Sequence, residues 1–400
     1  MPVSKIKKIV YFLYYPLLYD GRNLYFRDRA NVRTIEACVN IVHCECQIVA
    51  RTRKCEQNSL WVKLIDTPAQ LKLALPDYGA HGMLGWINLI RYLSPFLYYR
   101  LWRILKNADI VYVEGPSLES YLVSFFRLFL KFVIVLEMRA EMVLNKTYMF
   151  SRFGALGLIY RFILSSMFAR TRKTSDACLY INQSCRNLYP VQGSLMEAIS
   201  DAEIPNELFN FSRLNNECFT RFLYVGNLEK VKQVDQILSV LNSIKLKSSH
   251  NFSLDIVGDG PQEIQLKENA AMLGLDKIVQ FHGRLAWGQP VFEFYKKCDI
   301  MLINSCTETG PRVLLEAMAA GIPVICTRVG LAEELLDDCC LVSVGNLHEL
   351  ESKLINLTNN FDLRLAQSIK NRKRVSDFMA NNSSELRIDF WRRAFQISQT

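Results

Sequence analysis

The stretch that decides the fold runs from Asn304 to Val324 and reads NSCTETGPRVLLEAMAAGIPV. The apolar run before it predicts a strand, Gly310-Pro311 predicts a turn, and the residues that follow have helical spacing. A helix that begins directly after a strand directs free backbone N–H groups and its positive dipole end at the turn. Ligands of doubly wound domains bind at this end of the strands. The stretch therefore predicts an anion site.

Two carboxylates flank the start of this helix. Glu308 lies just before it, and Glu316 lies inside it, about two turns further along, so both can face one crevice. Amides at the helix start already serve a phosphate, so the carboxylates are better suited to accept hydrogen bonds from sugar hydroxyls. For either residue taken alone, the alternative is a helix cap and a surface salt bridge.

The rest of the chain alternates short strands with helix-length segments, which is typical of βα units around a parallel sheet. In the first half, strands are expected at 7–15, ending at Pro16, and at 47–51, 109–114, 132–137 and 177–182. In the second half, strands are expected at 219–225, 253–257, 278–281, 300–303, 324–326 and 340–342. The polar segment 192–216 is the expected linker. The fold class is α/β, with two Rossmann-like doubly wound domains.

Composition supports two folded domains with different partners. The chain has 400 residues, of which 50% are hydrophobic and 22% charged, and this balance excludes disorder and coiled coil as the dominant state. Residues 1–200 hold 26 Lys+Arg against 14 Asp+Glu, or +12, so the rest holds 48−26 = 22 against 39−14 = 25, or −3. We expect the basic half to bind an anionic partner, with no sign of nucleic acid.

Apolar segments of the first half do not predict a membrane span. The run 153–169 has Arg161 at its centre, which disfavours insertion into a bilayer. Leu97, Leu101 and Leu105 line one helix face, and Arg100 lies on another side. Two interpretations stay open, a basic amphipathic helix on anionic lipid and an ordinary domain helix with a solvated basic face.

No metal site is expected. The dense group of Cys38, His43, Cys44, Cys46 and Cys55 lacks the paired spacing of a zinc site and reads as reduced, buried thiols. The chain also has no Asp-x-Asp pair that could chelate a metal beside a diphosphate. We therefore expect neither a metal nor another cofactor.

Several motifs together resemble glycosyltransferase family 4, whose members are retaining enzymes of the GT-B fold. Glu308 and Glu316 stand in its Glu-x7-Glu signature, followed by Glu-Ala-Met-Ala-x-Gly-x-Pro-Val. Upstream, segments 225–235, 255–261 and 273–283 are similar to further family motifs. The motifs cover about residues 219–345, and residues 1–200 fit by general pattern only.

The resemblance implies roles in a donor site. Lys232 would neutralise the nucleotide diphosphate, Glu308 would contact the transferred sugar, and Glu316 would hold the ribose hydroxyls. The resemblance also implies that Gly226 and Asn227 contribute to the donor site from the loop after the first strand of the domain. Gly283 and Arg284 would line the base. The backbone of Thr309, Gly310, Pro311 and Arg312 would cap the phosphates.

The sequence also departs from the family pattern. Asn227 replaces a usual arginine, so that one diphosphate cation is missing unless Lys230 or Arg312 substitutes for it, and Gln233 stands where glycine is common.

The first domain departs from the pattern as well. The family's Gly-Gly loop is reduced to Asp20-Gly21, and Glu137 and Arg139 stand where a histidine is often found. Glu137 would orient the acceptor or the donor sugar; a helix cap or a structural pair with Arg139 is the alternative.

The resemblance implies a two-domain architecture facing a cleft. Residues 1–205 would bind the acceptor, residues 206–379 would bind the donor, and a tail helix at about 380–400 would cross back to the first domain. Catalysis would move a sugar, as in hexosyltransferases, from a nucleotide-diphosphate sugar to an acceptor hydroxyl with retention. Glu308, Lys232 and Glu137 are the expected catalytic residues.

The acceptor is expected to be a glycan or lipid-linked molecule of cell-envelope polysaccharide, lipopolysaccharide or glycolipid synthesis. The protein is expected to be cytoplasmic, at the inner face of the cytoplasmic membrane. Two alternatives remain: a non-catalytic nucleotide-sugar-binding protein and a sugar-nucleotide epimerase, both on the GT-B fold.

Overall fold

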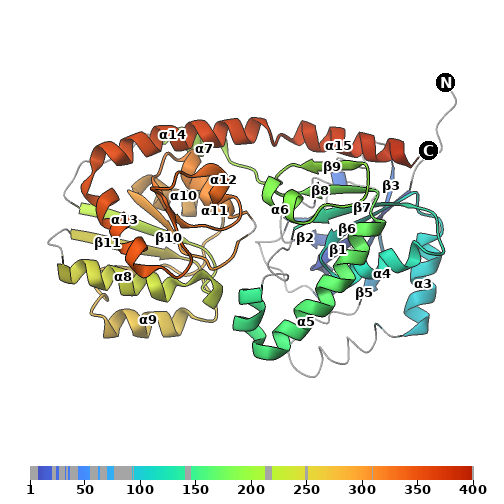
Figure 1. The fold of residues 1–400 in the computed structure, drawn as a ribbon, viewed down its shortest axis with the longest axis horizontal. Helices are drawn as coiled ribbons and strands as arrows, with labels where there is room; N and C mark the ends of the chain where they lie inside the picture. The colour runs from blue at the N-terminus through green and yellow to red at the C-terminus, as the bar shows by residue number, and fades with distance from the viewer. Residues whose placement is uncertain are drawn as a thin grey trace. The chain divides into compact units, whose positions relative to one another are not determined.

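The structure is a computed structural model, and its chain divides by contact into two compact units (Figure 1). The first unit holds Met1–Asp201 and Asn382–Thr400, and the second holds Ala202–Asn381. The residues that the structure describes are 8–19, 24–26, 32, 35–36, 44–54, 62–63, 70–75, 92, 94–139, 146–211, 219–247, 251–308 and 310–398.

The first unit is built on one sheet, which has nine strands in the described part of the chain. Its parallel strands are β1 (Lys8–Tyr19), β3 (Glu45–Lys54), β5 (Gln70–Leu75), β6 (Ile110–Gly115), β7 (Val133–Met138), β8 (Ala177–Tyr180) and β9 (Leu195–Ala198). The antiparallel pair β2 (Leu24–Phe26) and β4 (Val62–Lys63) extends the end of β1. A mainly parallel sheet must be covered on both faces, and this one is.

The two faces of β1 show how the sheet is covered. Ile9 and Tyr11 point into one apolar core, while Val10 and Phe12 point into the other, as the alternation of a strand requires. The covering helices are α3 (Pro95–Leu105), α4 (Leu118–Phe126), α5 (Lys146–Thr174), α6 (Gln183–Leu188) and α15 (Ser384–Ile397).

The prediction that the first strand stops at Pro16 is wrong. The backbone of β1 continues to Tyr19, and its pairing with β3 shifts register between Leu13 and Leu17. A proline has no N–H for the ladder, and an irregularity in the pairing is where a strand tolerates it.

The tail helix α15 belongs to the first unit, as the sequence predicted. Phe390, Trp391, Ala394 and Phe395 are buried in the same core as Tyr11 of β1. Trp391 lies 5.7 Å from the ring of Tyr112, between ring centroids. The apolar stripe of the tail thus completes one face of the sheet.

The polar segment 192–216 is not the simple linker that its composition predicted. Within it, β9 adds a parallel strand to β8, and α7 (Asn206–Phe209) forms a short helix whose Leu208 is fully buried. Polar residues at a sheet edge resemble a loop in sequence because only part of each side chain is buried.

The second unit is a doubly wound domain whose six strands are all parallel and lie in the order β12-β11-β10-β13-β14-β15. The strands are β10 (Phe219–Val225), β11 (Asn251–Val257), β12 (Val279–Phe281), β13 (Ile300–Ile303), β14 (Val324–Thr327) and β15 (Leu341–Val342). The helices are α8 (Val234–Lys247), α9 (Glu263–Met272), α10 (Gln289–Lys297), α11 (Arg312–Ala319), α12 (Ala332–Leu335), α13 (Leu347–Asn359) and α14 (Phe361–Ala380), with the 3₁₀ turn η2 (Lys230–Lys232) before α8. These elements confirm the predicted Rossmann-like pattern.

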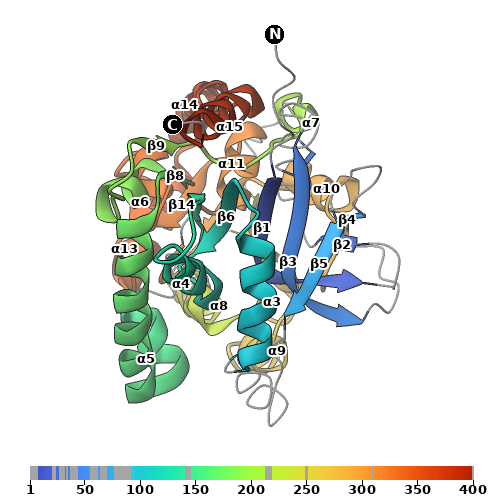
Figure 2. The same cartoon turned by 90° about the vertical axis from the view of Figure 1, so that its right-hand side faces the viewer.

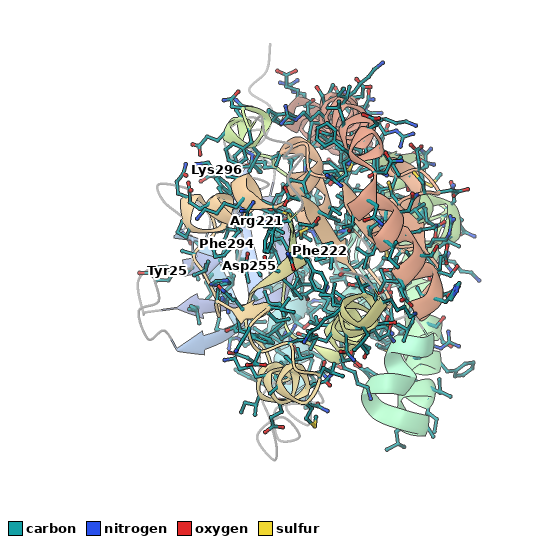
Figure 3. The ribbon with its side chains drawn as sticks, turned by 90° about the vertical axis from the view of Figure 1, so that its left-hand side faces the viewer. Tyr25, Arg221, Phe222, Asp255, Phe294 and Lys296 are labelled. Carbon is teal, nitrogen blue, oxygen red and sulfur yellow. The ribbon has the colours of Figure 1, made fainter. Side chains whose placement is uncertain are left out.

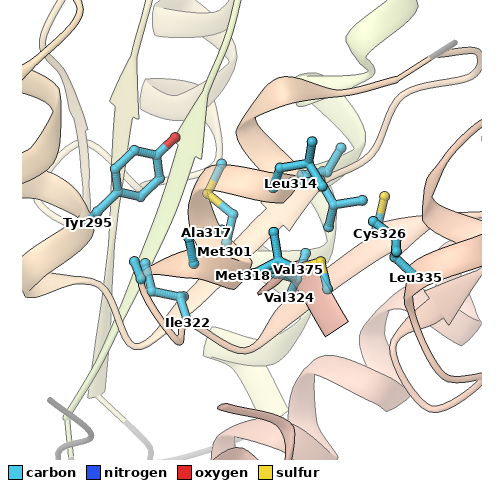
Figure 4. Close-up of a cluster of buried hydrophobic side chains, with 14 of the residues drawn as sticks. Tyr295, Met301, Leu314, Ala317, Met318, Ile322, Val324, Cys326, Leu335 and Val375 are labelled. Atoms are coloured by element: carbon cyan, nitrogen blue, oxygen red, sulfur yellow. The ribbon is translucent and has the colours of Figure 1, made fainter. Parts of the chain in front are cut away.

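Helix α11 is fixed by the core beneath it. Leu314, Ala317 and Met318 are buried and pack with Met301 of β13 and Val324 of β14 (Figure 4). An entirely apolar underside holds the helix rigidly on the sheet. The start of α11 is therefore held in place relative to the strand ends.

Among the helices that the structure describes, none combines the length and the apolar character needed to cross a bilayer.

Candidate functional site

The centre of the second sheet is a topological switch point. Adjacent β10 and β13 are joined by parallel pairing, β10 leads on to β11 and β12 on one side, and β13 leads to β14 and β15 on the other. Loops that follow two such strands diverge and leave a crevice at their carboxyl ends. The predicted site residues Lys232 and Glu308 lie in these two loops.

The loop after β10 packs against the loop after β11 without room for side chains. A Cβ atom on Gly258 would lie 1.9 Å from the carbonyl oxygen of Gly226, and Gly258 has φ 142°. The N–H of Leu228 donates to Asp259 O at 2.8 Å. The glycines thus allow a tight backbone contact that places the following turn.

That turn presents Lys232 at the start of α8. Residues Lys230–Lys232 form a 3₁₀ turn, and Gln233 follows in the left-handed region at φ 49° and ψ 41°. Glycine adopts this conformation without the cost that a Cβ imposes, which gives a physical reason for the glycine common at this position in the family pattern.

The two switch-point loops meet through Lys232 and Glu308. The ammonium of Lys232 donates to Glu308 Oε1, and Ser305 Oγ donates to the same oxygen at 2.8 Å. The N–H of Cys306 donates to Val231 O at 2.8 Å, which joins the backbones as well. Side chains of Lys232 and Glu308 remain 21% and 13% exposed, so solvent and ligands reach the pair.

The start of α11 lies in the same loop. Its N-cap, Pro311, makes no side-chain cap hydrogen bond, and the first turn has no acidic residue. Uncapped N–H groups without a competing carboxylate favour an anion. Gly310 and Arg312 are exposed there, whereas Thr309 lies outside the described residues.

Glu316 lies deeper, with 2% of its surface exposed. Its Oε1 accepts from Trp287 Nε1 at 3.0 Å, and its Oε2 accepts from the Tyr295 hydroxyl at 2.7 Å. Burial raises the pKa of Glu316, against the opposing effect of these two hydrogen bonds. Glu308 and Glu316 therefore have separate partners, and the sequence reasoning missed Trp287 and Tyr295.

The predicted base loop, at Gly283 and Arg284, is held by a second polar contact. A ring nitrogen of His282 lies 2.6 Å from Asp255 Oδ1, and its ring lies 4.5 Å from that of Phe294. Figure 3 labels Asp255 of β11 and Phe294 of α10, which both contact His282. The carbonyl of Gly283 accepts from Gly258 N–H at 2.8 Å, so this loop is tied to the end of β11.

The position of the missing arginine is filled by an exposed amide. Asn227 is exposed and its carbonyl accepts from the Tyr224 hydroxyl at 2.9 Å. Lys230 and Arg312, the two cations that could substitute, are both exposed, on η2 and at the first position of α11.

Glu137 lies in the first unit, at the end of β7, inside a buried ion cluster. Its carboxylate accepts from the Tyr112 hydroxyl at 2.5 Å, from Arg139 Nε at 2.8 Å and from Arg387 Nη2 at 3.1 Å. Arg139 also lies 3.3 Å from Asp201, between Nη1 and Oδ2. The pair between Glu137 and Arg139, which the sequence left open as an alternative, is present, and α15 supplies a second arginine.

This cluster makes stability depend on pH. Burial alone would raise the pKa of Glu137, but Arg139, Arg387 and the Tyr112 hydrogen bond lower it to about 2. In the unfolded chain the pKa of a glutamate carboxyl is about 4.3. The carboxylate therefore contributes stability that is complete above that value and is lost as the pH falls toward 2.

We expect wild type to exceed Glu137→Gln in Tm most strongly near neutral pH, with the difference shrinking as the pH falls below about 4. Thermal unfolding of both proteins across this range measures it. A Tm difference that is constant with pH would contradict the ion cluster.

Two predicted regions cannot be placed. Asp20 and Gly21 lie outside the described residues, as do Cys38, His43 and Cys55. Burial raises the pKa of the Cys44 thiol to about 12. In the parts of the chain that the structure describes, no three His, Cys, Asp or Glu side chains group so as to hold a metal ion.

Comparisons with known proteins identify a family that matches the second unit, and relatives of the chain. Residues 206–374 match the family described as Glycosyl transferases group 1. An uncharacterized glycosyltransferase of Haemophilus influenzae is 29% identical over 209 residues, or 51% of this chain and 58% of that protein. The N-acetyl-alpha-D-glucosaminyl L-malate synthase of Bacillus anthracis is 31% identical over 35% of this chain and 36% of its own length. The matched segments thus span between about a third and three fifths of these relatives.

The chain is also similar to a synthase that is named for a glycolipid. The alpha-monoglucosyldiacylglycerol synthase of Streptococcus pneumoniae is 29% identical over 29% of this chain and 26% of that protein.

Solved structures share the fold of the whole chain. Sucrose-phosphate synthase from Thermosynechococcus elongatus has a TM-score of 0.70 at 14% identity, covering 98% of this chain and 100% of that one. Anabaena HepE in complex with UDP-glucose has a TM-score of 0.62 at 15% identity, with coverage of 98% and 100%. The chain has the GT-B fold of glycosyltransferases, and its residues 206–374 carry the Glycosyl transferases group 1 sequence pattern.

Proposed function

We propose that this protein is a retaining glycosyltransferase that moves a hexosyl group from a nucleotide-diphosphate sugar to an acceptor hydroxyl. The observation that carries the proposal is the contact of Lys232 with Glu308 at the switch point, beside the uncapped start of α11. Cation, carboxylate and helix-start amides together suit a diphosphate that carries a sugar. The fold neighbour HepE was solved with UDP-glucose, which supports a nucleotide-sugar donor.

Donor binding would rearrange the contact between Lys232 and Glu308. A diphosphate offers the ammonium of Lys232 a more highly charged partner than one carboxylate does. Glu308 Oε1, which now accepts from Lys232, would then be free to accept from a hydroxyl of the sugar. Amides of the first turn of α11, with Arg312, would hold the remaining phosphate oxygens.

Glu316 would bind the ribose hydroxyls and would be held in position for this role by protein donors. Tyr295 and Trp287 each occupy one lone pair of its carboxylate, and each oxygen retains another. Trp287 is 50% exposed and follows Gly283 and Arg284 in the chain. Its ring is therefore a candidate surface for the base of the nucleotide.

The chemical step would break the bond between the anomeric carbon and the diphosphate oxygen. The electron pair would leave with the diphosphate, whose charge Lys232 and the amides of α11 would stabilise. The acceptor oxygen would form the new bond on the same face of the sugar and would lose its proton to the departing diphosphate.

We assign the acceptor to the basic first unit and to cell-envelope polysaccharide, lipopolysaccharide or glycolipid synthesis. A lipid-linked or anionic acceptor fits the net charge of +12 on residues 1–200. The similarity to an alpha-monoglucosyldiacylglycerol synthase supports a glycolipid. On this proposal the protein works at the inner face of the cytoplasmic membrane.

A thermal-shift panel of UDP-, GDP- and ADP-sugars tests the donor site. At 100 times the dissociation constant a ligand stabilises by about 2.7 kcal/mol, which is about 5–10 °C for a unit of this size. We expect one nucleotide to raise the Tm of the wild type by this amount. Glu316→Gln should lose most of the shift, because an amide nitrogen replaces one of its acceptors.

Glu268→Gln is the matched control, since Glu268 is exposed on α9 of the same unit. It should respond to the nucleotide as the wild type does. If none of the nucleotide sugars stabilised the wild type, the donor-site assignment would be wrong; binding without any turnover would favour a non-catalytic protein.

A further inference from the structure

A basic pocket opens on the first unit, away from the strand ends that carry Glu137. Its volume is about 300 Å³, and its lining includes Lys8, Lys72, Arg100 and Arg103 with the amides of Gln47 and Asn107. Lys8 is the first residue of β1 and Gln47 lies near the start of β3, so the pocket lies at the amino-terminal edge of the sheet. This is the edge opposite to that of ligand sites in doubly wound domains.

The charge of the pocket is only partly neutralised. Lys8 Nζ lies 3.7 Å from Glu45 Oε2, and the Glu45 carboxylate also accepts from Gln47 Nε2 at 2.8 Å. Within the described ranges, Arg100 and Arg103 form no ion pair with an acidic side chain. A second carboxylate lies nearby, because Asp109 Oδ2 accepts from the backbone N–H of Lys8 at 2.8 Å. The lining thus combines four cations with two nearby carboxylates, and the remaining positive charge favours an anionic ligand.

Exposed aromatic and aliphatic side chains lie along α3 and at the end of α4. We call them the aromatic surface, and its members are Phe96, Tyr99, Trp102, Phe125, Leu128 and Phe129, which are 37–66% exposed. Ring centroids of Trp102 and Phe129 lie 6.4 Å apart, and those of Phe125 and Phe129 lie 5.6 Å apart, so α3 and the end of α4 form one patch. Exposed apolar patches of this kind mark interaction sites.

The spacing along α3 explains why the pocket and the aromatic surface adjoin. Residues advance by about 100° each, so Arg100, Arg103 and Asn107 share one flank, while Trp102 and Lys106 lie on the other. Figure 2 shows α3 between β5 and α4. Phe96 lies on the cationic flank, with the Arg100 guanidinium 5.9 Å from its ring centroid, and Tyr99 lies on the outer face between the two flanks. Aromatic and cationic side chains therefore adjoin along α3.

We propose that this pocket and the aromatic surface dock the protein on a bilayer by binding the phosphate of anionic phospholipid headgroups. Aromatic side chains partition into the interface of a bilayer, and arginines beside them meet the phosphates at the same depth. An acidic protein partner would satisfy the cations but not the apolar area around them. The site rests on the proposed membrane location and is independent of sugar transfer.

Vesicle sedimentation of the full chain tests the site. We expect wild type to bind vesicles made of equal parts of phosphatidylcholine and phosphatidylglycerol at low salt and to be released at high salt. Binding to phosphatidylcholine alone should be weak. Arg100→Gln with Arg103→Gln should bind the mixed vesicles about 30-fold more weakly, given the contribution of each cation near an anionic surface. Trp102→Ser with Phe129→Ser should bind more weakly at every salt concentration.

The matched control is Lys297→Gln with Lys373→Gln, two exposed lysines of the second unit that change the net charge by the same amount. It should bind as the wild type does. The proposal would be overturned if the Arg100→Gln, Arg103→Gln double variant bound the mixed vesicles as tightly as the wild type does. It would also be overturned if the wild type bound phosphatidylcholine vesicles as tightly as the mixed vesicles. Stabilisation by soluble glycerol 3-phosphate without vesicle binding would overturn it too, in favour of a soluble ligand.

The same preparations are tested with the nucleotide-sugar panel, which separates this proposal from the donor site. If a nucleotide sugar stabilises the protein but the protein does not bind vesicles, the docking site is refuted and the donor site is unaffected. The reverse result would refute the donor site alone.

Discussion

Lys232→Ala is expected to lower kcat for sugar transfer by about 10²–10³-fold, the size of effect seen when one group that stabilises developing negative charge is removed. The charge on the departing diphosphate grows as the sugar–oxygen bond breaks, so the ammonium acts more strongly in the transition state than on the bound donor. The loss should therefore appear mainly in kcat. Release of nucleoside diphosphate from the donor that stabilises the wild type measures it.

Lys277→Ala is the matched control for this change, because Lys277 is exposed just before β12, at the opposite edge of the same sheet. Its kcat should stay close to that of the wild type. Glu308→Gln separates the roles of the two loops: it keeps Lys232 but removes the carboxylate that accepts from it. If Lys232→Ala retained kcat within about tenfold, the ammonium would not be acting on the leaving group.

Arg387→Ala is expected to destabilise the first unit by about 3 kcal/mol. Removing one partner of a buried ion pair costs about 3–5 kcal/mol, and the lower value applies because Arg139 and Tyr112 still contact Glu137. Hydrogen exchange of the β7 and α15 amides in the full chain reports the opening free energy of this unit.

Arg393→Ala on the same helix provides the control. Arg393 is 42% exposed and lies 3.0 Å from Glu197, between Nη1 and Oε1. A pair this exposed contributes less than about 1 kcal/mol. Equal protection of the two variants would show that the buried cluster does not hold α15 to the sheet.

The fold of the second unit can be predicted from the sequence because its central strands are buried on both faces. Runs such as 300–303 are apolar at every position, and their ends were predicted within a residue or two. In the first unit β5 was missed, although its sequence QLKLAL alternates polar and apolar residues as a half-buried strand does. The short strand β9 was missed because of its partial burial.

The site was predictable only where its residues share a local pattern. Glu308 and Lys232 were found from motifs, and the structure brings them into contact although they are 76 residues apart. No motif marks Tyr295 as the partner of Glu316, because the contact depends on how α10 packs beside α11. Trp287 offered a weak signal, an aromatic residue close after the predicted base loop. Arg387 offered none, since it reaches Glu137 across 250 residues.

The place of α15 in the first unit has a consequence for synthesis on the ribosome. Phe390, Trp391 and Phe395 complete the core around β1, yet they are translated after the whole of the second unit. Translation proceeds at about 5–20 residues per second, so roughly 10–40 s pass between the synthesis of β9, the last strand of the first unit, and the synthesis of α15. During that interval one apolar face of its sheet lacks its cover, whereas the second unit can fold as soon as it emerges. The domain that is made first is thus the one that is finished last.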